Sequence, residues 1–586
     1  MKSHVTDLVR HALESLDLTT DPSGNGAIDP HVERTRDPRH GDFTTNVAMR
    51  LAKPLGRRPR ELAEALVAAL PASAQVDRVD IAGPGFINFT LSEAAGRTQI
   101  SEILDRGQAY GCSDMGRGTR VLLEYVSANP TGPLHVGHGR HAAYGATLAN
   151  LLSATGHEVH REYYVNDAGR QMEILAISVW VRYLQARGVE IAMPANGYRG
   201  DYVRDIAGTL SAVYGDRFVV AAETFRDGLP PDAPEGGDQD TYVDAVVVRA
   251  RELLGEEGYR EIFDQGLNAV LDDIRDDLEG FGVSYDRWYS ERSLSTHGTI
   301  DAALDRLSAR DRLYVKEGAT WFRASDYGDE KDRVVIRENG VKTYFASDIA
   351  YHHEKRTRGF DLLLDVLGAD HHGYVARVRA GLEAMGERPE TLEVRLVQFV
   401  TLYRGGEKMQ MSTRSGEFVT LRELREEVGN DAARLFYVMR SNDQHLDFDL
   451  ELAKSSSSDN PVYYIQYAHA RVCSVMRQLT ERGLAWNREQ GLAALEQVEE
   501  PQAKALTRSL SRYPEVIELA ALNRAPQTLV FYLRDLAHDF HTWYNAQPFL
   551  VDDAALRDAR LALCLAARQV IANGLTLLGV SAPERM

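Results

Sequence analysis

Residues 119–138 of the chain read TRVLLEYVSANPTGPLHVGH, and this stretch gives the strongest indication of the fold. The run TRVLLEYVSAN is apolar and rich in β-forming residues, and it stops at Asn129-Pro130, where a turn begins. A helical pattern follows over residues 134–156, and a second strand pattern, HEVHREYYVND, covers residues 157–167. Strand, turn, helix and strand in this order are typical of the opening unit of a doubly wound parallel sheet.

The segments on either side of this unit predict two further domains. Residues 1–112 combine helical patterns with the strand pattern VDIAGPGFINFTL, and from about residue 430 onward the pattern is almost purely helical. We therefore expect a small N-terminal α/β domain at 1–112, a Rossmann-like α/β doubly wound domain at 113–455 and an all-α helical bundle at 456–586. An acidic insertion at about 186–295 interrupts the central domain, and strand patterns return at 318–324, 332–340, 341–347 and 361–370.

Charge is shared unevenly among these regions. The 586 residues include 67 Lys and Arg against 86 Asp and Glu, a net charge of −19, which excludes a generally basic nucleic-acid coat protein. By region the net charge is −2 for residues 1–112, −16 for 113–455 and −1 for 456–586. Because the two flanking regions are nearly neutral, a local nucleic-acid surface on either of them is compatible with the composition.

The cysteines and the N-terminal residues indicate the cellular compartment in which the protein is expected. Cys112, Cys473 and Cys564 lie far apart and form no CxxC pair, which argues against a disulfide framework and a cysteine zinc site and suits a reducing cytoplasm. Acidic residues among the apolar ones make the N-terminus an amphipathic helix rather than a signal peptide. No uncharged apolar stretch of about 18 residues occurs, so we expect no membrane span.

Two histidines three residues apart, His135 and His138, stand at the start of the helix expected at 134–156. They share a face of its first turn, where unpaired N–H groups and the helix dipole attract phosphate. Gly137 between them would let a flat base approach the backbone. An isolated HxxH pattern usually has no function, and it is the preceding strand and turn that favour a phosphate site here.

A second candidate segment, LYRGGEKMQMSTRSG, covers residues 402–416. It is basic, punctuated by glycines and flanked by strand and helix patterns, as expected of a mobile loop that grips phosphate. Taken alone, the segment is better explained as an exposed hairpin.

Together the two segments resemble the signatures of the class I aminoacyl-tRNA synthetases, and among them the arginyl-tRNA synthetases. The sequence HVGH at 135–138 resembles the HIGH signature, and QMSTR at 410–414 resembles a degenerate KMSKS signature. Four more stretches are similar to this family: GDFTTNVA at 41–48, YYVNDAG at 163–169, DAAR at 431–434 and LLGVSAPERM at 577–586. Each stretch alone is weak, but six in order are specific, and the resemblance covers the whole chain.

The resemblance implies which residues hold L-arginine. A guanidinium always carries its charge, so its binding needs carboxylates in a matching fork geometry. Glu124 and Asp348 are implied on the guanidinium, and Asn129 on the α-amino or carboxylate end. Tyr344 would pack or hydrogen bond, and His371 would contact arginine or the adenylate. Two alternatives stay open, with Glu124 as an ion pair at a strand end and Asp348 as a helix cap.

The implied reaction has two steps and uses ATP and Mg²⁺. The arginine carboxylate attacks the α-phosphate of ATP and releases pyrophosphate, and the 2′-hydroxyl of the terminal tRNA adenosine then attacks the arginyl-adenylate and releases AMP. His135 and His138 would stabilise the charge that develops on the phosphate oxygens. The family further implies that adenylate formation waits for tRNA. The implied ATP contacts are His135, Gly137, His138, Gly139, Met411 and Ser412.

Thr413 stands where the KMSKS signature usually has its second lysine. Family members that lack this lysine often carry one just before the HIGH signature, but residues 129–134, NPTGPL, contain none. Another cation must therefore stabilise the departing pyrophosphate. The candidates are Lys408, Arg404 and Arg414, of which we favour Lys408 and Arg414 as catalytic residues.

Arginine tRNA is implied to span all three domains. The C-terminal DALR-type domain would take the anticodon by stacking with Tyr463, Tyr467 and Arg471, although tyrosines at helical spacing are more often core residues. Arg57 and Arg58 of the N-terminal domain would meet the outer corner of the tRNA. We expect a monomer in the cytoplasm with no membrane partner.

Three alternatives remain beside this interpretation. His352, His353, His371 and His372 with nearby acids could form a metal site. However, GADHHG at 368–373 matches the family's substrate-side loop, so we expect no metal site. A small-molecule nucleotidyltransferase would share the HxGH helix, but the long helical C-terminal domain argues against it. A synthetase-like RNA-binding or regulatory protein without catalysis would be consistent with the degenerate KMSKS segment.

Overall fold

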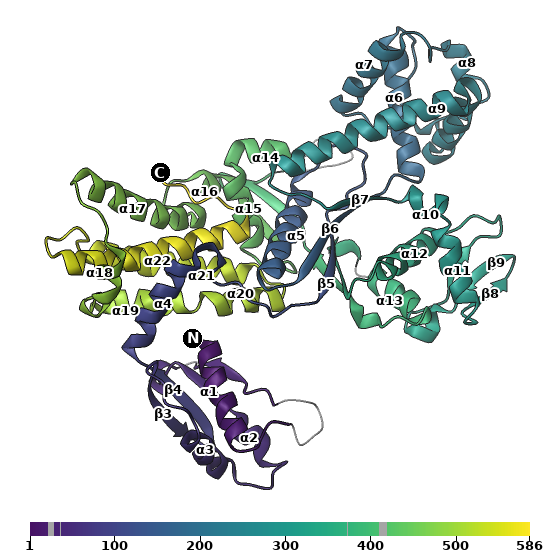
Figure 1. Ribbon diagram of the computed structural model, residues 1–586. Coiled ribbons are helices and arrows are strands. Elements are labelled where there is room, and N and C mark those ends of the chain that lie inside the picture. Colours follow the sequence, from purple (N-terminus) through teal and green to yellow (C-terminus); the bar gives the residue numbers. More distant parts are fainter. Residues whose placement is uncertain (21–27, 36, 372, 410–418) are drawn as a thin grey trace.

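The computed structural model describes residues 1–20, 28–35, 37–371, 373–409 and 419–586. Figure 1 shows a small N-terminal unit below the main body, a helical bundle at the C-terminal side and a central sheet from which two lobes extend. Helix α4 (Glu93–Arg106) joins the N-terminal unit to the body and packs among the C-terminal helices.

The N-terminal unit is an antiparallel sheet of order β1-β2-β4-β3 with helices packed against it. Its core includes Val5, Phe43, Leu62 and Phe89. Tyr110 packs instead in the core of the main body, so the core of the unit does not mark the expected boundary at 112, and that boundary stays a prediction. The elements of the unit are α1 (Lys2–Ser15), β1 (Val32–Arg34), β2 (Phe43–Thr45), α2 (Val47–Ala52), α3 (Pro59–Ala68), β3 (Val76–Ala82) and β4 (Phe86–Leu91).

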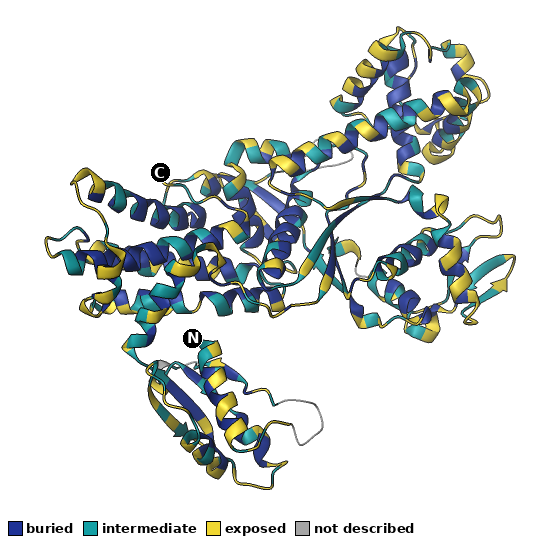
Figure 2. Ribbon diagram, in the orientation of Figure 1, coloured by how far each residue is buried: buried dark blue, intermediate teal, exposed yellow. Residues whose placement is uncertain are grey.

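The central sheet has five parallel strands in the order β12-β11-β5-β6-β7, which confirms the expected doubly wound fold. Side chains alternate along β5, so that Val121 and Leu123 pack in the core that contains α5, and Leu122 packs on the opposite face in the core that contains α12. Figure 2 shows that β5, most of β11 and most of α5 are buried, whereas β6, β7 and β12 are partly exposed. The strands are β5 (Arg120–Tyr125), β6 (Glu158–Val165), β7 (Arg287–Ser290), β11 (Leu362–Gly368) and β12 (Leu392–Val397).

Helices and two small sheets complete the central region. A three-stranded antiparallel sheet has the order β10-β9-β8, and a mixed sheet of order β14-β13-β15 lies next to the second signature segment. The helices are α5 (Val136–Ala154), α6 (Arg170–Ala186), α7 (Asp201–Tyr214), α8 (Ala222–Arg226), α9 (Gln239–Gly280), α10 (Arg292–Thr296), α11 (Thr299–Ser308), α12 (Tyr344–Thr357), α13 (Tyr374–Ala384), α14 (Leu421–Val428), α15 (Asn430–Val438) and α16 (Leu450–Lys454). The remaining strands are β8 (Leu313–Lys316), β9 (Ala319–Phe322), β10 (Arg333–Ile336), β13 (Val400–Arg404), β14 (Glu407–Lys408) and β15 (Leu446–Asp449).

Two details of the central region differ from the sequence expectations. The strand pattern at 341–347 is wrong, because helix α12 begins at Tyr344, and the Thr343 side chain caps it by accepting a hydrogen bond from the Ala346 amide. The expected insertion at about 186–295 contains β7, which pairs with β6 as the edge strand of the central sheet. Helices α6, α7 and α9 pack together into the upper lobe of Figure 1.

The C-terminal region is a helical bundle around α22. Of the described residues, only α22 forms a helix long and apolar enough to cross a membrane, and 72% of its most apolar window is buried inside the protein, as in a core helix. Arg434, in the DAAR stretch, donates hydrogen bonds to the carbonyls of Phe281 and Leu578 and so links α15 to the ends of α9 and α22. The helices are α17 (Pro461–Glu481), α18 (Arg488–Ala493), α19 (Pro501–Ser511), α20 (Tyr513–Leu522), α21 (Gln527–Ala546) and α22 (Ala554–Leu578).

Candidate active site

The two signature histidines cap helix α5 with their own rings. The His135 Nδ1 accepts a hydrogen bond from the Gly137 amide at 3.1 Å, and the His138 Nδ1 accepts one from the His135 amide at 3.2 Å. The two rings stack with their centroids 3.6 Å apart. A side chain at Gly137 would collide with the His135 ring, at 2.8 Å from its Cε1 atom, so this glycine is required by the folded-back cap. Gly139 packs against Leu421 and Tyr437.

This capping arrangement sets the chemistry of the two rings. Burial lowers the pKa of His135, and burial together with the neighbouring histidines lowers the pKa of His138 well below its usual value. Both imidazoles are therefore neutral at pH 7. Because Nδ1 accepts a backbone hydrogen bond in each ring, the proton resides on Nε2, and the Nε2–H groups act as donors at the positive end of the helix.

The residues that follow the second segment pack against the first signature turn. The Val136 amide donates to the Val419 carbonyl at 3.2 Å, and the Leu421 amide donates to the Leu134 carbonyl at 2.8 Å. The predicted residues Met411, Ser412, Thr413 and Arg414 lie outside the described residues. The segment that contains them is preceded by Lys408, which is exposed on β14, and followed by Val419, which is bonded to the first turn of α5. Arg404, the other cation considered, pairs with Glu427 at 2.7 Å.

Two acidic side chains, Asp348 and Glu291, lie close together beside the carboxyl ends of the central strands, and we call this pair the acidic pocket. Burial, opposed by His352 and Tyr374 and reinforced by Glu124, raises the pKa of Asp348 to about 6. Burial and the nearby carboxylates of Asp348 and Asp167 raise the pKa of Glu291 to about 7. The Glu291 Oε2 atom is buried and has no hydrogen-bond partner in the described part of the chain. Such a concentration of underpaired negative charge fits a cationic ligand.

Sequence reasoning did not find Glu291. Its signal was available, because Glu291 directly follows a short strand pattern and the carboxyl ends of parallel strands line the ligand side of such sheets. The strand itself, β7, was assigned to the insertion, so its end was not considered as a site.

Glu124 is the last residue but one of β5, another strand of the same sheet, and its carboxylate is already held by groups of the protein. Its Oε2 lies 2.5 Å from the Lys355 Nζ and 3.0 Å from the Tyr351 hydroxyl, and its Oε1 accepts from the Ser127 hydroxyl at 3.0 Å. Glu124 is 6% exposed. The strand-end ion pair that was left open as an alternative is therefore present, and a contact with substrate arginine stays a prediction.

The contacts of the remaining predicted arginine-binding residues, Tyr344, Asn129 and His371, are as follows. The Tyr344 side chain is exposed, and its hydroxyl lies 2.8 Å from the position that a Cβ on Gly169 would take. Gly169 has a φ of +99°, which favours glycine there. Asn129 is exposed and bonds to the Asn166 and Gln171 side chains at 2.7 and 2.9 Å. The His371 side chain is exposed beside Asp370.

The four histidines considered as metal ligands serve other contacts where they are described. His352 bonds to Asp365 at 2.7 Å, His353 faces Glu387 at 4.0 Å, and His372 lies outside the described residues. In the described ranges, no group of three or more His, Cys, Asp or Glu side chains is arranged to hold a metal ion.

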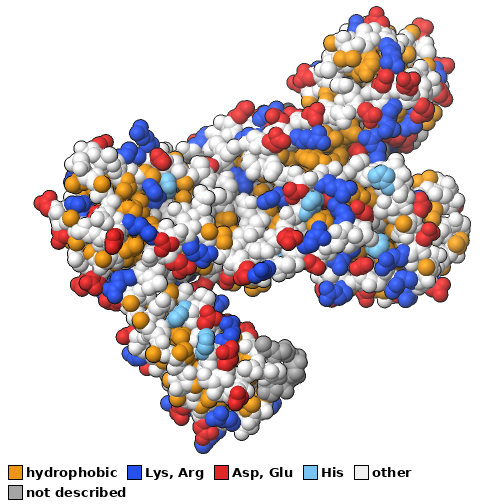
Figure 3. All heavy atoms as spheres, viewed as in Figure 1, with side chains coloured by type: hydrophobic (Ala, Val, Ile, Leu, Met, Phe, Trp, Pro, Cys, Tyr) orange, Lys and Arg blue, Asp and Glu red, His pale blue; other side chains and the backbone are white. Residues whose placement is uncertain are grey.

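The predicted tRNA contacts lie on the two flanking regions. Arg57 is exposed and Arg58 pairs with Glu61 between α2 and α3. On α17 the rings of Tyr463 and Tyr467 stack 5.7 Å apart, and the Arg471 guanidinium lies 4.5 Å from the Tyr467 ring centroid. Both tyrosines are partly exposed rather than core residues. Figure 3 shows basic and acidic side chains intermixed over the viewed face of the molecule.

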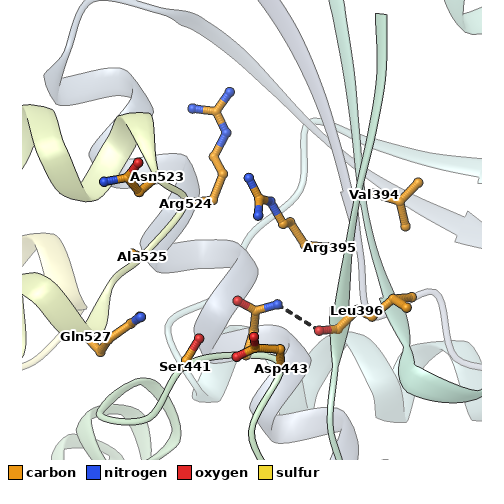
Figure 4. A pocket seen from close by; sticks show the side chains of 10 residues that line it. Val394, Arg395, Leu396, Ser441, Asp443, Asn523, Arg524, Ala525 and Gln527 are labelled. Atoms are coloured by element: carbon orange, nitrogen blue, oxygen red, sulfur yellow. Dashed lines mark hydrogen bonds between the residues drawn. The ribbon is translucent and has the colours of Figure 1, made fainter. Parts of the chain in front are cut away.

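A separate polar cavity of about 290 Å³ lies between β12 and the turn that joins α20 to α21 (Figure 4). Its Arg395 and Arg524 side chains both pair with Glu393, at 2.6 and 3.0 Å. None of the predicted site residues lines this cavity, so it is distinct from the site at the strand ends.

Comparisons with known proteins agree with this geometry over the whole chain. The arginyl tRNA synthetase N terminal domain matches residues 3–91, the class I (R) tRNA synthetase catalytic domain matches 99–198 and 257–466, and the DALR anticodon binding domain matches 465–586. These matches overturn the alternative of a small-molecule nucleotidyltransferase.

Full-length relatives and solved structures point to the same family. The chain is 60% identical to an arginine–tRNA ligase of Thioalkalivibrio sulfidiphilus and 57% identical to one of Halorhodospira halophila, with all of each chain covered. A Campylobacter jejuni structure described as an arginyl-tRNA synthetase is 32% identical, with a TM-score of 0.73 over 85% of this chain and all of its own. The Thermus thermophilus arginyl-tRNA synthetase, 23% identical, shares the fold over the full length of both chains with a TM-score of 0.73. The chain belongs to the arginyl-tRNA synthetase family of the class I aminoacyl-tRNA synthetases.

Proposed function

We propose that this protein attaches L-arginine to arginine tRNA in two steps at the site between the N-terminus of α5 and the carboxyl ends of β5, β6 and β7. The observation that carries the proposal is the full-length identity of 60% to an arginine–tRNA ligase. ATP is the activating substrate, as in the class I family. The residue roles below are supported by the contacts around each side chain.

The N-terminus of α5 is proposed to stabilise the first transition state. When the arginine carboxylate attacks the α-phosphate, negative charge develops on the equatorial oxygens. The neutral rings of His135 and His138 present Nε2–H donors, and the helix N-terminus adds backbone N–H groups and its dipole. Positioning and electrostatics are enough for this step, and no covalent enzyme intermediate is needed.

The acidic pocket is proposed to hold the guanidinium. Glu124 and Asp348 are proposed to bind the guanidinium, and Glu291, which is buried beside Asp348, is proposed to join them. Tyr344 is proposed to pack against the ligand or hydrogen bond to it from the N-terminus of α12. Asn129 and His371 are proposed to contact the α-amino and carboxylate end or the adenylate. Lysine and citrulline would leave part of this fork unpaired, so the pocket would reject them without an editing step.

Lys408 and Arg414 are proposed to neutralise the departing pyrophosphate in place of the missing KMSKS lysine. The support for Lys408 is its exposed position at the end of β14, where the second signature segment begins, and the support for Arg414 is its place in the sequence of that segment. Met411 and Ser412 are proposed ATP contacts on the same ground. Mg²⁺ would enter as the counter-ion of the ATP phosphates, its usual ligands in such sites.

The proposed tRNA surface includes Arg57 and Arg58 on the N-terminal unit and the stack of Tyr463, Tyr467 and Arg471 on α17 of the C-terminal bundle. The stack offers ring faces and a guanidinium plane, which are the groups that bind unstacked bases. A cytoplasmic location remains our proposal, supported by the three free cysteines, and we also propose that the protein is a monomer.

Arginine-dependent pyrophosphate exchange, measured with and without arginine tRNA, tests the function. We expect exchange only when tRNA is present. No exchange under either condition would favour the alternative of a synthetase-like protein without catalysis. Exchange in the absence of tRNA would contradict only the proposed tRNA dependence.

A further inference from the structure

Three carboxylates lie side by side beneath the arginine pocket. Asp365 of β11, Glu124 of β5 and Glu162 of β6 are direct neighbours in the strand register, so their side chains point to the same face of the sheet. Their exposures are 1%, 6% and 0%. Three adjacent buried carboxylates are strongly unfavourable unless cations and hydrogen-bond donors compensate them.

Helix α12 and the residue after it supply this compensation. The Lys355 Nζ lies 2.5 Å from Glu124 and 2.9 Å from Asp365. Arg358 pairs with Glu162, and His352 bonds to Asp365 at 2.7 Å. The Tyr351 hydroxyl lies 3.0 Å from Glu124 and 2.8 Å from Glu162, so it bridges two of the acids. The helix is therefore fastened to the sheet through the whole row.

Lys355 is the only member of this group that contacts two of the three acids as a cation within the described residues. Its side chain is completely buried. Burial alone would lower the pKa of Lys355, but Asp365, Glu124 and Glu162 together raise it, so the ammonium stays charged. The same pairing keeps the pKa of Asp365 below its usual value despite burial.

The row also connects to the substrate side of α12. Asp348 lies one turn before His352, whose Nδ1 bonds to the Asp348 carbonyl at 2.8 Å, and Tyr344 begins the helix. A carboxylate has about four acceptor positions, and Lys355, Tyr351 and Ser127 occupy three of those on Glu124. One direction remains for a donor from outside the cluster.

We propose that Lys355 is a positioning residue for arginine binding: it aims the Glu124 carboxylate and fixes α12 on the sheet, so that Glu124 and Asp348 stand at a set distance across the pocket. The inference rests on the proposed function, because it deepens the assignment of the arginine site. Lys355 acts through the two carboxylates and makes no contact with arginine itself.

Two variants test the proposal. Lys355→Met with Asp365→Asn removes the cation together with one of its two acids, which restores the charge balance of the row but leaves Glu124 without its ammonium partner. Tyr351→Phe keeps the ring, which packs 4.5 Å from Tyr164 and 4.8 Å from Tyr289, and removes only the bridging hydroxyl. A variant that fails to fold is recognised by circular dichroism, and in that case the other variant decides.

The readout is pyrophosphate exchange with arginine tRNA present, with KM measured separately for arginine and for ATP, and arginine binding by calorimetry. We expect the double variant to raise the arginine KM and Kd at least about tenfold, or about 1.4 kcal/mol, with the ATP KM within about twofold. Tyr351→Phe should raise the arginine KM about three- to tenfold, the value of one hydrogen bond. Lys504→Met, which removes a remote ion pair to Glu93 at 2.8 Å, should change neither KM.

Several outcomes would overturn the proposal. One is a folded double variant or Tyr351→Phe variant with the wild-type arginine KM, and another is a rise of the arginine and ATP KM values together, as expected of a purely structural cluster. If the wild-type protein exchanges pyrophosphate, the proposed function holds, and these two outcomes overturn only the role assigned to Lys355. A wild-type protein that neither exchanges pyrophosphate nor binds arginine would overturn both.

Discussion

Glu291 is about half protonated near pH 7 and Asp348 near pH 6, since their pKa values are raised to about 7 and about 6. A guanidinium binds the carboxylate form, so arginine must displace these protons when the pH is low. We expect the arginine KM at pH 6 to be at least about tenfold higher than at pH 8, because each pH unit below a required pKa costs up to about a factor of ten. Initial exchange rates at varied arginine concentrations, with the ATP KM as the reference, measure this.

The raised pKa of Glu291 has the opposite pH dependence in its effect on the stability of the folded protein when arginine is absent. A carboxyl whose pKa is raised on folding contributes stability below its unfolded value, which is 4.5 for Glu291, and that contribution is lost as the pH rises through about 7. Glu291→Gln should abolish this loss of stability at rising pH. It should also make the arginine KM depend less on pH at the upper end of the range. An arginine KM that is constant from pH 6 to 8 in the wild type would contradict the assignment.

Lys408 is the described cation expected to act on pyrophosphate. We expect Lys408→Ala to lower the rate of adenylate formation at least about tenfold, or about 1.4 kcal/mol, because the leaving group loses a neutralising charge. Arg404→Ala is the matched control and should have a smaller effect, since Arg404 is paired with Glu427 at 2.7 Å. Unchanged pyrophosphate exchange in Lys408→Ala would refute its role.

Single residues could be predicted where the residues that determine their surroundings lie close to them in the sequence. The place of His135 and His138 at the start of a helix was predicted correctly, because the turn and the spacing both occur within a short stretch of sequence. Glu291 and Lys355 were not predicted, because the groups that surround them are set by the pairing of strands that lie far apart in the sequence. No local pattern shows that a lysine on α12 will be buried between β5 and β11.

At the scale of elements, the approach of α5 to β5 sets the position of the signature turn. A Cβ on Gly145 would lie 2.3 Å from the Tyr125 ring, which is itself fully buried. We expect Gly145→Ala to cost about 1–3 kcal/mol of unfolding free energy by overpacking and to lower the exchange rate by displacing α5. Urea unfolding and exchange kinetics measure the two effects.

Gly208 provides the matched control for this substitution. It lies in α7, and a Cβ there meets nothing within 4 Å. Gly208→Ala should therefore be neutral or stabilise the protein by up to about 1 kcal/mol through helix propensity. If both alanine variants behaved alike, the packing argument for Gly145 would fail.

Element prediction succeeded where the periodicity and the end signals agreed. The strand, turn, helix and strand over residues 119–167 appear as β5, α5 and β6. It failed at 341–347, where alternating apolar residues suggested a strand. Thr343 caps helix α12 there. The helix is also held to the sheet by ionic contacts, which the spacing of apolar residues in the sequence does not indicate.

At the scale of the whole molecule, the uneven charge acquires a structural explanation. Several of the central acids form the pocket and the buried row beneath it, whereas the flanking regions have net charges of only −2 and −1. An overall charge of −19 therefore does not oppose tRNA binding, because association follows local surface charge.

The contribution of the N-terminal unit to tRNA binding can be measured from the salt dependence of the binding constant. If Arg57 and Arg58 bind tRNA phosphates, removal of either guanidinium should weaken binding at low salt and reduce the slope of log K against log salt concentration by roughly 0.7–0.9. We expect the double variant Arg57→Ala, Arg58→Ala to lower the slope by about 1.5, with the arginine KM unchanged. Arg78→Ala removes a guanidinium on β3 of the same unit that is not part of the proposed tRNA surface, and it should leave the slope near the wild-type value. Equal slopes in the double variant and the wild type would place the tRNA on another surface.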